Sequence, residues 1–207
     1  MSALHKLHVV DPEDRARADL YDFLGLLLAK PADASLLNQI ASLKSNPSPL
    51  GQAPLGQAMD TLSRLAGVTA TDTAEREFNT LFIGLGRGEL LPFASYYLTG
   101  FLNEKPLAKL RGDMSRRGIV RSADRHEPED NIASLMEMMG GMIVGRFGTV
   151  TPLEDQQAFF DAHIGPWAIH FFTDLEGSRS SVFYTAVGTI GRQFMEIEQE
   201  AFRMLAS

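Results

Sequence analysis

The chain has 207 residues, of which 44% are hydrophobic and 22% charged, and a formal net charge of −7 at pH 7. This length suffices for one large domain with a sizeable core. The acidic balance argues against a general nucleic-acid binder, which needs a basic face. The absence of cysteine excludes disulfides, thiolate nucleophiles, iron–sulfur clusters and cysteine-based zinc sites.

The N-terminal residues, MSALHKLHVVDPEDR, lack the apolar core of a signal peptide. The apolar stretch LGLLLA that follows is far too short to cross a bilayer. We therefore expect a cytoplasmic protein without stable membrane insertion.

Helical periodicity runs through the N-terminal half, about residues 1–110. An apolar stripe over Asp14–Lys30 recurs at helical spacing, and a shorter stripe covers Leu36–Leu43. The proline-rich stretch Lys44–Pro54 interrupts the pattern, which resumes at Leu55 and continues to Leu65.

A helix over about Thr73–Ile83 is expected next, and it ends in the glycine-rich loop Gly84–Pro92. A short helix is then expected to carry Tyr96, Tyr97, Phe101 and Leu102. Pro106 is placed to open the following helix, since a proline is tolerated in a first helical turn.

The stretch Arg111–Asp130 shows no clear period, and we interpret it as a hinge between the two halves of one domain. Within it lies an arginine cluster that fits either a solvated loop paired with nearby acids or an anion-binding site: Arg111, Arg116, Arg117, Arg121 and Arg125. Pro128 suits the first turn of the next helix, where Glu129 and Asp130 would meet the positive end of the helix dipole.

The C-terminal half, about residues 131–207, is also helical in pattern. An apolar stripe runs from Ile132 to Ile143, and Thr151–Glu154 has the form of a capping box. Pro166 is placed to open another helix, and a long last helix is expected over about Ser181–Leu205. Without any alternating strand pattern, the sequence predicts an all-α fold, one compact domain of about eight to ten helices.

Patterns typical of a metal site or an enzyme are missing from the sequence. No Glu-x-x-His pair of a di-iron bundle occurs, and Gly165-Pro166 separates His163 from His170. The loop Gly84–Gly88 lacks the Lys-Ser/Thr of a Walker loop and follows a helix, so a helix cap is its simpler interpretation. No Gly-x-Ser-x-Gly elbow is present. We therefore predict no catalysis, no metal and no cofactor.

The methionines of the Ile132–Ile143 stripe leave two interpretations open. Met136, Met138, Met139 and Met142 suit a packed core, and flexible thioethers also line grooves that accept varied apolar peptides.

Three stretches, in this order, resemble motifs of one family. Leu81–Tyr97, LFIGLGRGELLPFASYY, is similar to Leu-Phe-x-Gly-x-Gly followed by Pro-x-x-Ser-x-Tyr. Glu127–Met139, EPEDNIASLMEMM, is similar to Glu-Pro-x-Asp-His followed by an apolar helix. The third is HIGPW, His163–Trp167, with Phe183-Tyr184 in the next helix. Together they resemble the TorD/DmsD family of cytoplasmic chaperones for molybdenum-containing oxidoreductases, over roughly Asp14 to the C-terminus.

The resemblance implies a TorD-like helical fold and a function that needs no catalysis. Such chaperones bind the twin-arginine signal peptide, and often the body, of an apo-molybdoenzyme until its molybdopterin cofactor is inserted before export. The resemblance also implies weak guanine-nucleotide binding in some members, and a monomer or a domain-swapped dimer. The residues that match the motifs, and are expected to bind the peptide, are Pro92, Ser95, Tyr96, Glu127, Pro128, Asp130, Asn131, His163, Pro166 and Trp167.

A twin-arginine leader combines a cationic n-region with an apolar h-region, so its receptor needs carboxylates beside an apolar groove. Glu127, Glu129 and Asp130 precede the methionine-rich stripe and offer that combination. Asn131 stands where the family has histidine, and His126 is a candidate substitute for the missing imidazole.

Two further positions depart from the family motif, since Leu85 replaces the proline of Gly-Pro-Gly and Ala94 replaces the glutamate before the serine. The alternatives to a chaperone are a nucleotide-binding switch or enzyme using Gly84–Gly88 and the arginine cluster, and a structural subunit of a redox complex.

Overall fold

The computed structural model describes residues 10–43, 53–84, 87–121 and 127–205. Within these ranges the chain forms ten α-helices and no strand, which confirms the predicted all-α fold. The helices are α1 Pro12–Ala29, α2 Ala34–Ala41, α3 Pro54–Ala66, α4 Thr71–Phe78, α5 Ala94–Thr99, α6 Lys105–Arg116, α7 Ile132–Val144, α8 Leu153–His163, α9 Ala168–Glu176 and α10 Phe183–Leu205, and a π-helical turn, Asn79–Ile83, continues α4.

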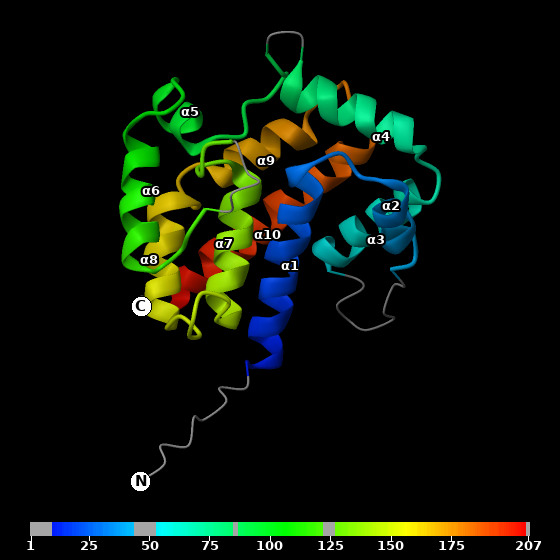
Figure 1. Cartoon of the computed structure of the whole chain (residues 1–207). Helices are drawn as coiled ribbons and strands as arrows, with labels where there is room; N and C mark the ends of the chain where they lie inside the picture. Colours follow the sequence, from blue (N-terminus) through cyan, green and yellow to red (C-terminus); the bar gives the residue numbers. More distant parts are fainter. Residues whose placement is uncertain (1–9, 44–52, 85–86, 122–126, 206–207) are drawn as a thin grey trace.

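The helix α7 lies at the centre of the molecule, between α1 on one side and α6 and α8 on the other (Figure 1). Apolar residues occupy most positions of α7, and the helix is buried on nearly all sides. Met136 and Met139 are fully buried core residues. Met138 and Met142 are also buried, at 8% and 2% exposure. All four methionines therefore belong to the core, and the peptide-groove interpretation stays a prediction.

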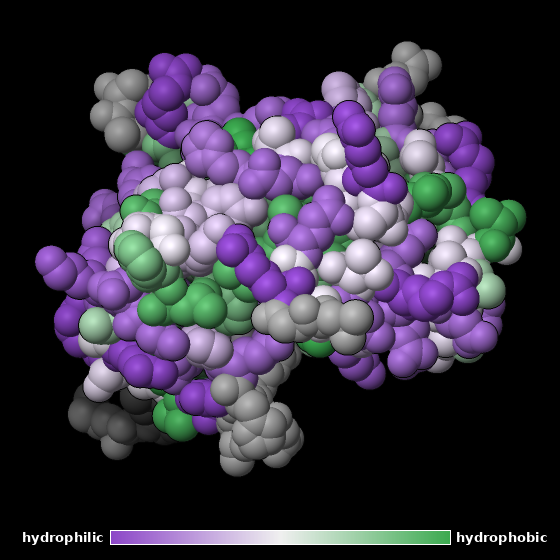
Figure 2. Space-filling view, turned by 90° about the horizontal axis from the view of Figure 1, so that it is seen from above, coloured by the Kyte–Doolittle hydropathy of each residue, from purple (hydrophilic) through white to green (hydrophobic). Residues whose placement is uncertain are grey.

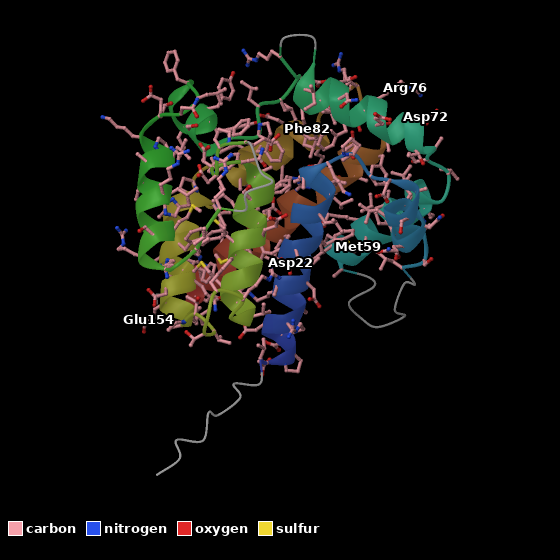
Figure 3. The ribbon with its side chains drawn as sticks, in the orientation of Figure 1. Asp22, Met59, Asp72, Arg76, Phe82 and Glu154 are labelled. Atoms are coloured by element: carbon pink, nitrogen blue, oxygen red, sulfur yellow. The ribbon has the colours of Figure 1, made fainter. Side chains whose placement is uncertain are left out.

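The contact between α1 and α7 depends on residues without side chains. A Cβ on Gly25 would lie 2.9 Å from Cγ of Glu137, and a Cβ on Gly140 would lie 2.6 Å from Oδ1 of Asp22. Both distances are shorter than van der Waals contact, so the two helices approach more closely than larger residues would allow. Figure 3 labels Asp22 on α1, where that helix faces α7.

The last helix, α10, is tied to α1 by a buried ionic contact. Arg17 on α1 donates from Nε and Nη2 to the Glu198 carboxylate at 2.9 and 2.8 Å. The Tyr21 hydroxyl donates to the same carboxylate at 2.9 Å. Glu198 is only 1% exposed, so these donors replace the water that its charge would otherwise need.

Some expected helix boundaries are wrong because long-range contacts override the local signal. The helix α7 begins at Ile132 with Asn131 as its N-cap, so Pro128 and Asp130 precede the helix and are not in its first turn. Thr151 does not cap α8, whose N-cap is Pro152. The Thr151 amide instead donates to the Met142 carbonyl at 3.0 Å.

Other boundaries shift for local reasons. Gly100, with φ of 82°, ends α5, so Phe101 and Leu102 lie beyond the short helix. Pro166 lies in the turn before α9, which begins at Ala168. The helix α6 continues to Arg116, so the aperiodic stretch is shorter than predicted. Arg125 and His126 lie outside the described residues, and the division into halves at a hinge stays a prediction.

Candidate functional site

The first two motifs meet in one backbone clamp at the start of α5 and α7. Phe93 and Asn131 form an isolated antiparallel bridge. The Ala94 amide donates to the Asp130 carbonyl at 3.0 Å, and the Ile132 amide donates to the Pro92 carbonyl at 2.8 Å. The structure therefore brings together residues that lie far apart in the sequence.

Asp130 serves this clamp from inside the protein. Its Oδ2 accepts the Ser95 amide at 2.8 Å and so caps α5, which has no cap of its own. Asp130 and Ser95 are 1% and 0% exposed, and Pro92 is also buried. Within the described part of the chain, Oδ1 of Asp130 and Oγ of Ser95 have no hydrogen-bond partner. Asp130 thus holds the backbone, and its carboxylate does not reach solvent.

A groove of about 180 Å³ opens beside the clamp, between the end of α6 and the exposed edge of α7. Its residues combine an apolar floor with a charged rim: Met114, Ile119, Val120, Arg121, Glu127, Glu129, Ser134, Glu137, Met138, Arg146 and Phe147. Of the predicted peptide-binding residues, only Glu127 is among them. The groove nevertheless has the expected chemistry, since carboxylates lie beside a methionine-bearing floor.

Glu129 is held at the groove by arginines. Nε and Nη2 of Arg111 lie 2.9 and 2.8 Å from its Oε2, and Nη1 of Arg121 lies 3.8 Å from its Oε1. Burial alone would raise the pKa of Glu129, but Arg111, the residue's own backbone amide and Arg121 together lower it. Glu129 is therefore ionised at neutral pH, and Glu127 beside it is exposed to solvent.

Sequence reasoning missed the polar residues of α7 that face the groove. Ser134 and Glu137 are one helical turn apart on an otherwise apolar helix. That spacing is a signal, because two polar residues on one face of a buried helix mark where it reaches the surface. Arg146 also lines the groove and donates to Asp22 of α1.

The third motif forms a second cluster, at the corner between α8 and α9. The Trp167 indole donates to the His163 carbonyl at 2.8 Å and its ring lies 5.3 Å from that of Tyr97. Trp167 and His163 are buried, whereas Pro166 is exposed. This cluster packs α5 against α9 and is separate from the groove. Tyr96, half-buried on α5, instead contacts Arg87, whose guanidinium lies 5.1 Å from the tyrosine ring.

His163 is a neutral hydrogen-bonding group. Burial, with the nearby cations Lys109, Arg117 and Arg116, lowers its pKa to about 4. Its Nε2 lies within hydrogen-bond distance of the Asp113 carboxylate on α6. A neutral imidazole that donates to this carboxylate joins α8 to α6.

The backbone turn after Ile83 accounts for the glycines of the glycine-rich loop. Gly84 has φ of 61°, and a Cβ on Gly88 would lie 2.5 Å from the Leu81 carbonyl oxygen. Arg87 is engaged by Tyr96, and Glu89 accepts from Ser178. Leu85 and Gly86 lie outside the described residues. Gly84, Arg87 and Glu89 line an open hollow together with Asn79, Thr80 and Ile83.

A second hollow, of about 430 Å³, lies between the start of α3 and the last turns of α10. Leu55, Ile197 and Met204 make it more apolar than the groove, and it contains no predicted site residue. On the face seen from above, apolar groups occur in separate patches among hydrophilic ones (Figure 2).

The described ranges contain neither a metal cluster nor a membrane-spanning helix. No group of three or more histidine, aspartate or glutamate residues there is arranged to hold a metal ion. No helix in the same ranges is long and apolar enough to cross a membrane.

Comparison with known proteins identifies a family whose members are similar in sequence to this chain. A family model described as nitrate reductase delta subunit matches residues 49–173, more than half of the chain. The chaperone protein TorD of Aliivibrio fischeri is 31% identical over 138 residues, which cover 62% of this chain and 64% of that relative. The chaperone protein TorD of Ferrimonas balearica is 25% identical over 193 residues, 88% of each chain. These relatives confirm the resemblance that the motifs predicted.

A solved structure has the same fold. It is of a proposed redox enzyme maturation protein from Archaeoglobus fulgidus, with a TM-score of 0.57 and 16% sequence identity. The similarity covers 93% of this chain and 99% of that one. At this identity the likeness supports the helical fold alone.

Proposed function

We propose, from the premise that this chain belongs to the nitrate reductase delta subunit family, that it is a cytoplasmic chaperone for an apo-molybdoenzyme. The observation that carries the proposal is the groove, where Glu127 and Glu129 lie beside an apolar floor. A twin-arginine leader presents the complementary pair of features, cations followed by an apolar stretch. Binding alone would keep the client from export until its molybdopterin cofactor is inserted.

The leader would bind with its arginines at the carboxylate rim. Glu127 is exposed and ready to accept a guanidinium, and Oε1 of Glu129 is the oxygen that Arg111 does not hold. Guanidinium–carboxylate hydrogen bonds are among the stronger ones in proteins. The arginines would therefore fix the position of the leader at this end of the groove.

The apolar part of the leader would pack along the floor. The floor is lined by the half-buried ring of Phe147 and by small exposed parts of Met114 and Met138, which are 5% and 8% exposed. Methionine side chains adapt to different apolar partners, so this surface tolerates variation in the leader's apolar sequence. The small groove volume indicates that it anchors a short stretch and not the whole leader.

Most of the motif residues would act by positioning the groove. Asp130, Ser95, Pro92 and Asn131 hold the two segments that form the clamp. Pro128 lies between the rim residues Glu127 and Glu129, just before the clamp residue Asp130 in the sequence. These clamp residues and Pro128 would therefore contribute to binding by fixing the position of the 127–129 segment.

The third motif would support the same frame from the other side. His163 and Trp167 join α8 and α9 to α6 and α5. Only Tyr96 and Pro166 of the remaining predicted residues have accessible side chains, and both lie outside the groove. Any contact that they make would be with the client body.

The test is calorimetric titration with synthetic leaders of the molybdoenzymes of the source organism. We expect one twin-arginine leader to bind at micromolar affinity or better, and its twin-lysine version to bind more weakly, because lysine cannot form bidentate contacts. Equal affinity for both versions would contradict arginine recognition. Failure of every leader to bind would refute leader binding as the function.

The family description favours a second candidate, a structural subunit that remains with the finished enzyme. Stoichiometric copurification with the mature, cofactor-loaded enzyme would support this subunit role. A chaperone would copurify with the apo form and leave after cofactor insertion.

A further inference from the structure

The segment Ser115–Arg121 has the same chemistry as the proposed ligand. Its sequence, SRRGIVR, places two adjacent arginines before an apolar pair and ends in a third arginine. The proposed client leader likewise joins adjacent arginines to apolar residues. This segment lies at the end of α6, on the edge of the groove.

The backbone directs this segment into the groove. Gly118, with φ of 67°, ends α6, and the Ile119 amide donates back to the Met114 carbonyl at 2.9 Å. The turn brings Ile119, Val120 and Arg121 to the groove lining. Ile119 is 6% exposed and belongs to the core cluster, whereas Val120 is 85% exposed. Ile119 and Val120 therefore form part of the apolar wall that a ligand in the groove would contact.

Arg121 lies against the carboxylate that the leader would use. Arg111 holds Oε2 of Glu129 at 2.8 Å, and Arg121 lies 3.8 Å from Oε1. That distance is longer than a hydrogen bond, so the contact is an ion pair that another guanidinium can displace. Arg121 also lowers the pKa of Glu129, so its positive charge stabilises the ionised carboxylate.

The adjacent arginine pair itself is directed away from the groove. Arg116 contacts Asp113 on its own helix. Arg117 lies 3.7 Å from Asp155 and 6.0 Å from the Phe159 ring centroid. The segment thus lines the groove, pairs with one of its carboxylates through Arg121, and leaves Glu127 for a second cation.

We propose that Arg121 is a built-in competitor of the leader's arginines, which pairs with Glu129 at the edge of the groove until a client with two arginines displaces it. This inference rests on the proposed function, since it concerns the regulation of that same groove. A site partly occupied by its own chain lowers the apparent affinity by the fraction that is free. Peptides with a single cation would then bind poorly, and the competitor would add specificity for paired arginines.

The test compares the leader affinities of Arg121→Gln and Arg116→Gln. Both variants lose one positive charge near the groove, but only the first removes the guanidinium that faces Glu129. We expect Arg121→Gln to bind the leader about threefold to fivefold more tightly than the unmodified protein, the range typical of a partly exposed ion pair. Arg116→Gln should change the affinity by less than about twofold, because its pairing is local. Arg121→Lys, which keeps the charge, should bind more weakly than Arg121→Gln.

The outcomes separate this inference from the proposed function. If the unmodified protein binds the leader and Arg121→Gln binds it no more tightly than Arg116→Gln, the competitor is refuted and leader binding stands. Weaker binding by Arg121→Gln would mean that Arg121 contacts the client, which also overturns the competitor. If neither the unmodified protein nor Arg121→Gln binds any leader, the proposed function and the inference fail together.

Discussion

Replacing Asp130 separates positioning from client contact. In Asp130→Ala the buried Ser95 amide loses its charged acceptor, which is 2.8 Å away in the intact protein. A buried hydrogen bond to a charged group contributes about 1.5–3 kcal/mol. For a chain of this size each kcal/mol corresponds to about 2–4 °C, so we expect the thermal midpoint to fall by about 3–12 °C. Circular dichroism during thermal unfolding measures this shift.

Binding supplies the second half of the test. Asp130→Asn keeps an oxygen that can accept the Ser95 amide, and so it should fold. Because Asp130 is 1% exposed, the folded variant should bind the leader within about twofold of the unmodified protein. Glu127→Ala is the matched control in the same segment. It should unfold within about 2 °C of the unmodified protein, as surface substitutions usually do, and yet bind more weakly.

One result would refute this reasoning. If folded Asp130→Asn loses leader binding by more than about tenfold, a free-energy change of about 1.4 kcal/mol, the carboxylate contacts the client and the positioning role is wrong.

Three further substitutions test the frame around the groove. Glu198→Ala removes the acceptor of a buried ion pair and should cost about 3–5 kcal/mol in chemical denaturation, whereas a loss below about 1 kcal/mol would show that the pair is dispensable. Gly140→Ala places a methyl group against the facing helix and should lower the stability by about 1–3 kcal/mol; an unchanged midpoint would contradict this close approach. The pKa of His163, lowered to about 4, means that the unfolded chain binds more protons between pH of about 6.5 and 4. Stability should therefore fall as the pH decreases through this window, and His163→Gln should flatten the decrease.

The helical fold could be predicted because its signals are local. The stripe from Ile132 to Ile143 repeats at helical spacing, and the structure makes it the buried helix α7. The break after Ile83 also follows from a neighbouring residue, since Gly84 there adopts a positive φ. Periodicity thus indicates where helices lie and which faces they bury.

The clamp and the groove could not be predicted in the same way, because they depend on pairing between distant residues. Nothing near Asp130 indicates that its carboxylate accepts the Ser95 amide, 35 residues away. Glu127 matches the motif and Glu129 does not, yet it is Glu129 that is buried and held by Arg111 and Arg121, while Glu127 is exposed. The motif resemblance pointed to this segment, but the position and partners of each acid required the fold.

Thr151 illustrates the opposite failure, in which a local signal is present but is not used. Thr, Pro and Glu stand at the spacing of a capping box. In the structure the Thr151 amide binds the end of α7, and Gln156 donates to the Thr151 carbonyl at 2.8 Å. Tertiary hydrogen bonds therefore replace the expected cap. The sequence alone does not show these bonds, because they depend on how α7 and α8 pack.

The recognition proposed at the rim would depend on charge, and the chain offers a control for it. Glu127→Gln should weaken leader binding by about twofold to fivefold, because one exposed carboxylate contact is lost. Glu154→Gln makes the same change on α8, at an exposed position that Figure 3 labels. Equal losses in both variants would mean that only the overall negative charge attracts the leader.

The most direct test of the central claim is to locate the bound leader through the methionine methyl groups. The chain has nine methionines, of which Met114 and Met138 line the groove and Met204 lines the hollow between α3 and α10. In a methyl NMR titration with a twin-arginine leader, we predict that the resonances of Met114 and Met138 shift and that of Met204 does not. A shift of Met204 with Met114 and Met138 unchanged would place the leader in the other hollow and contradict the account.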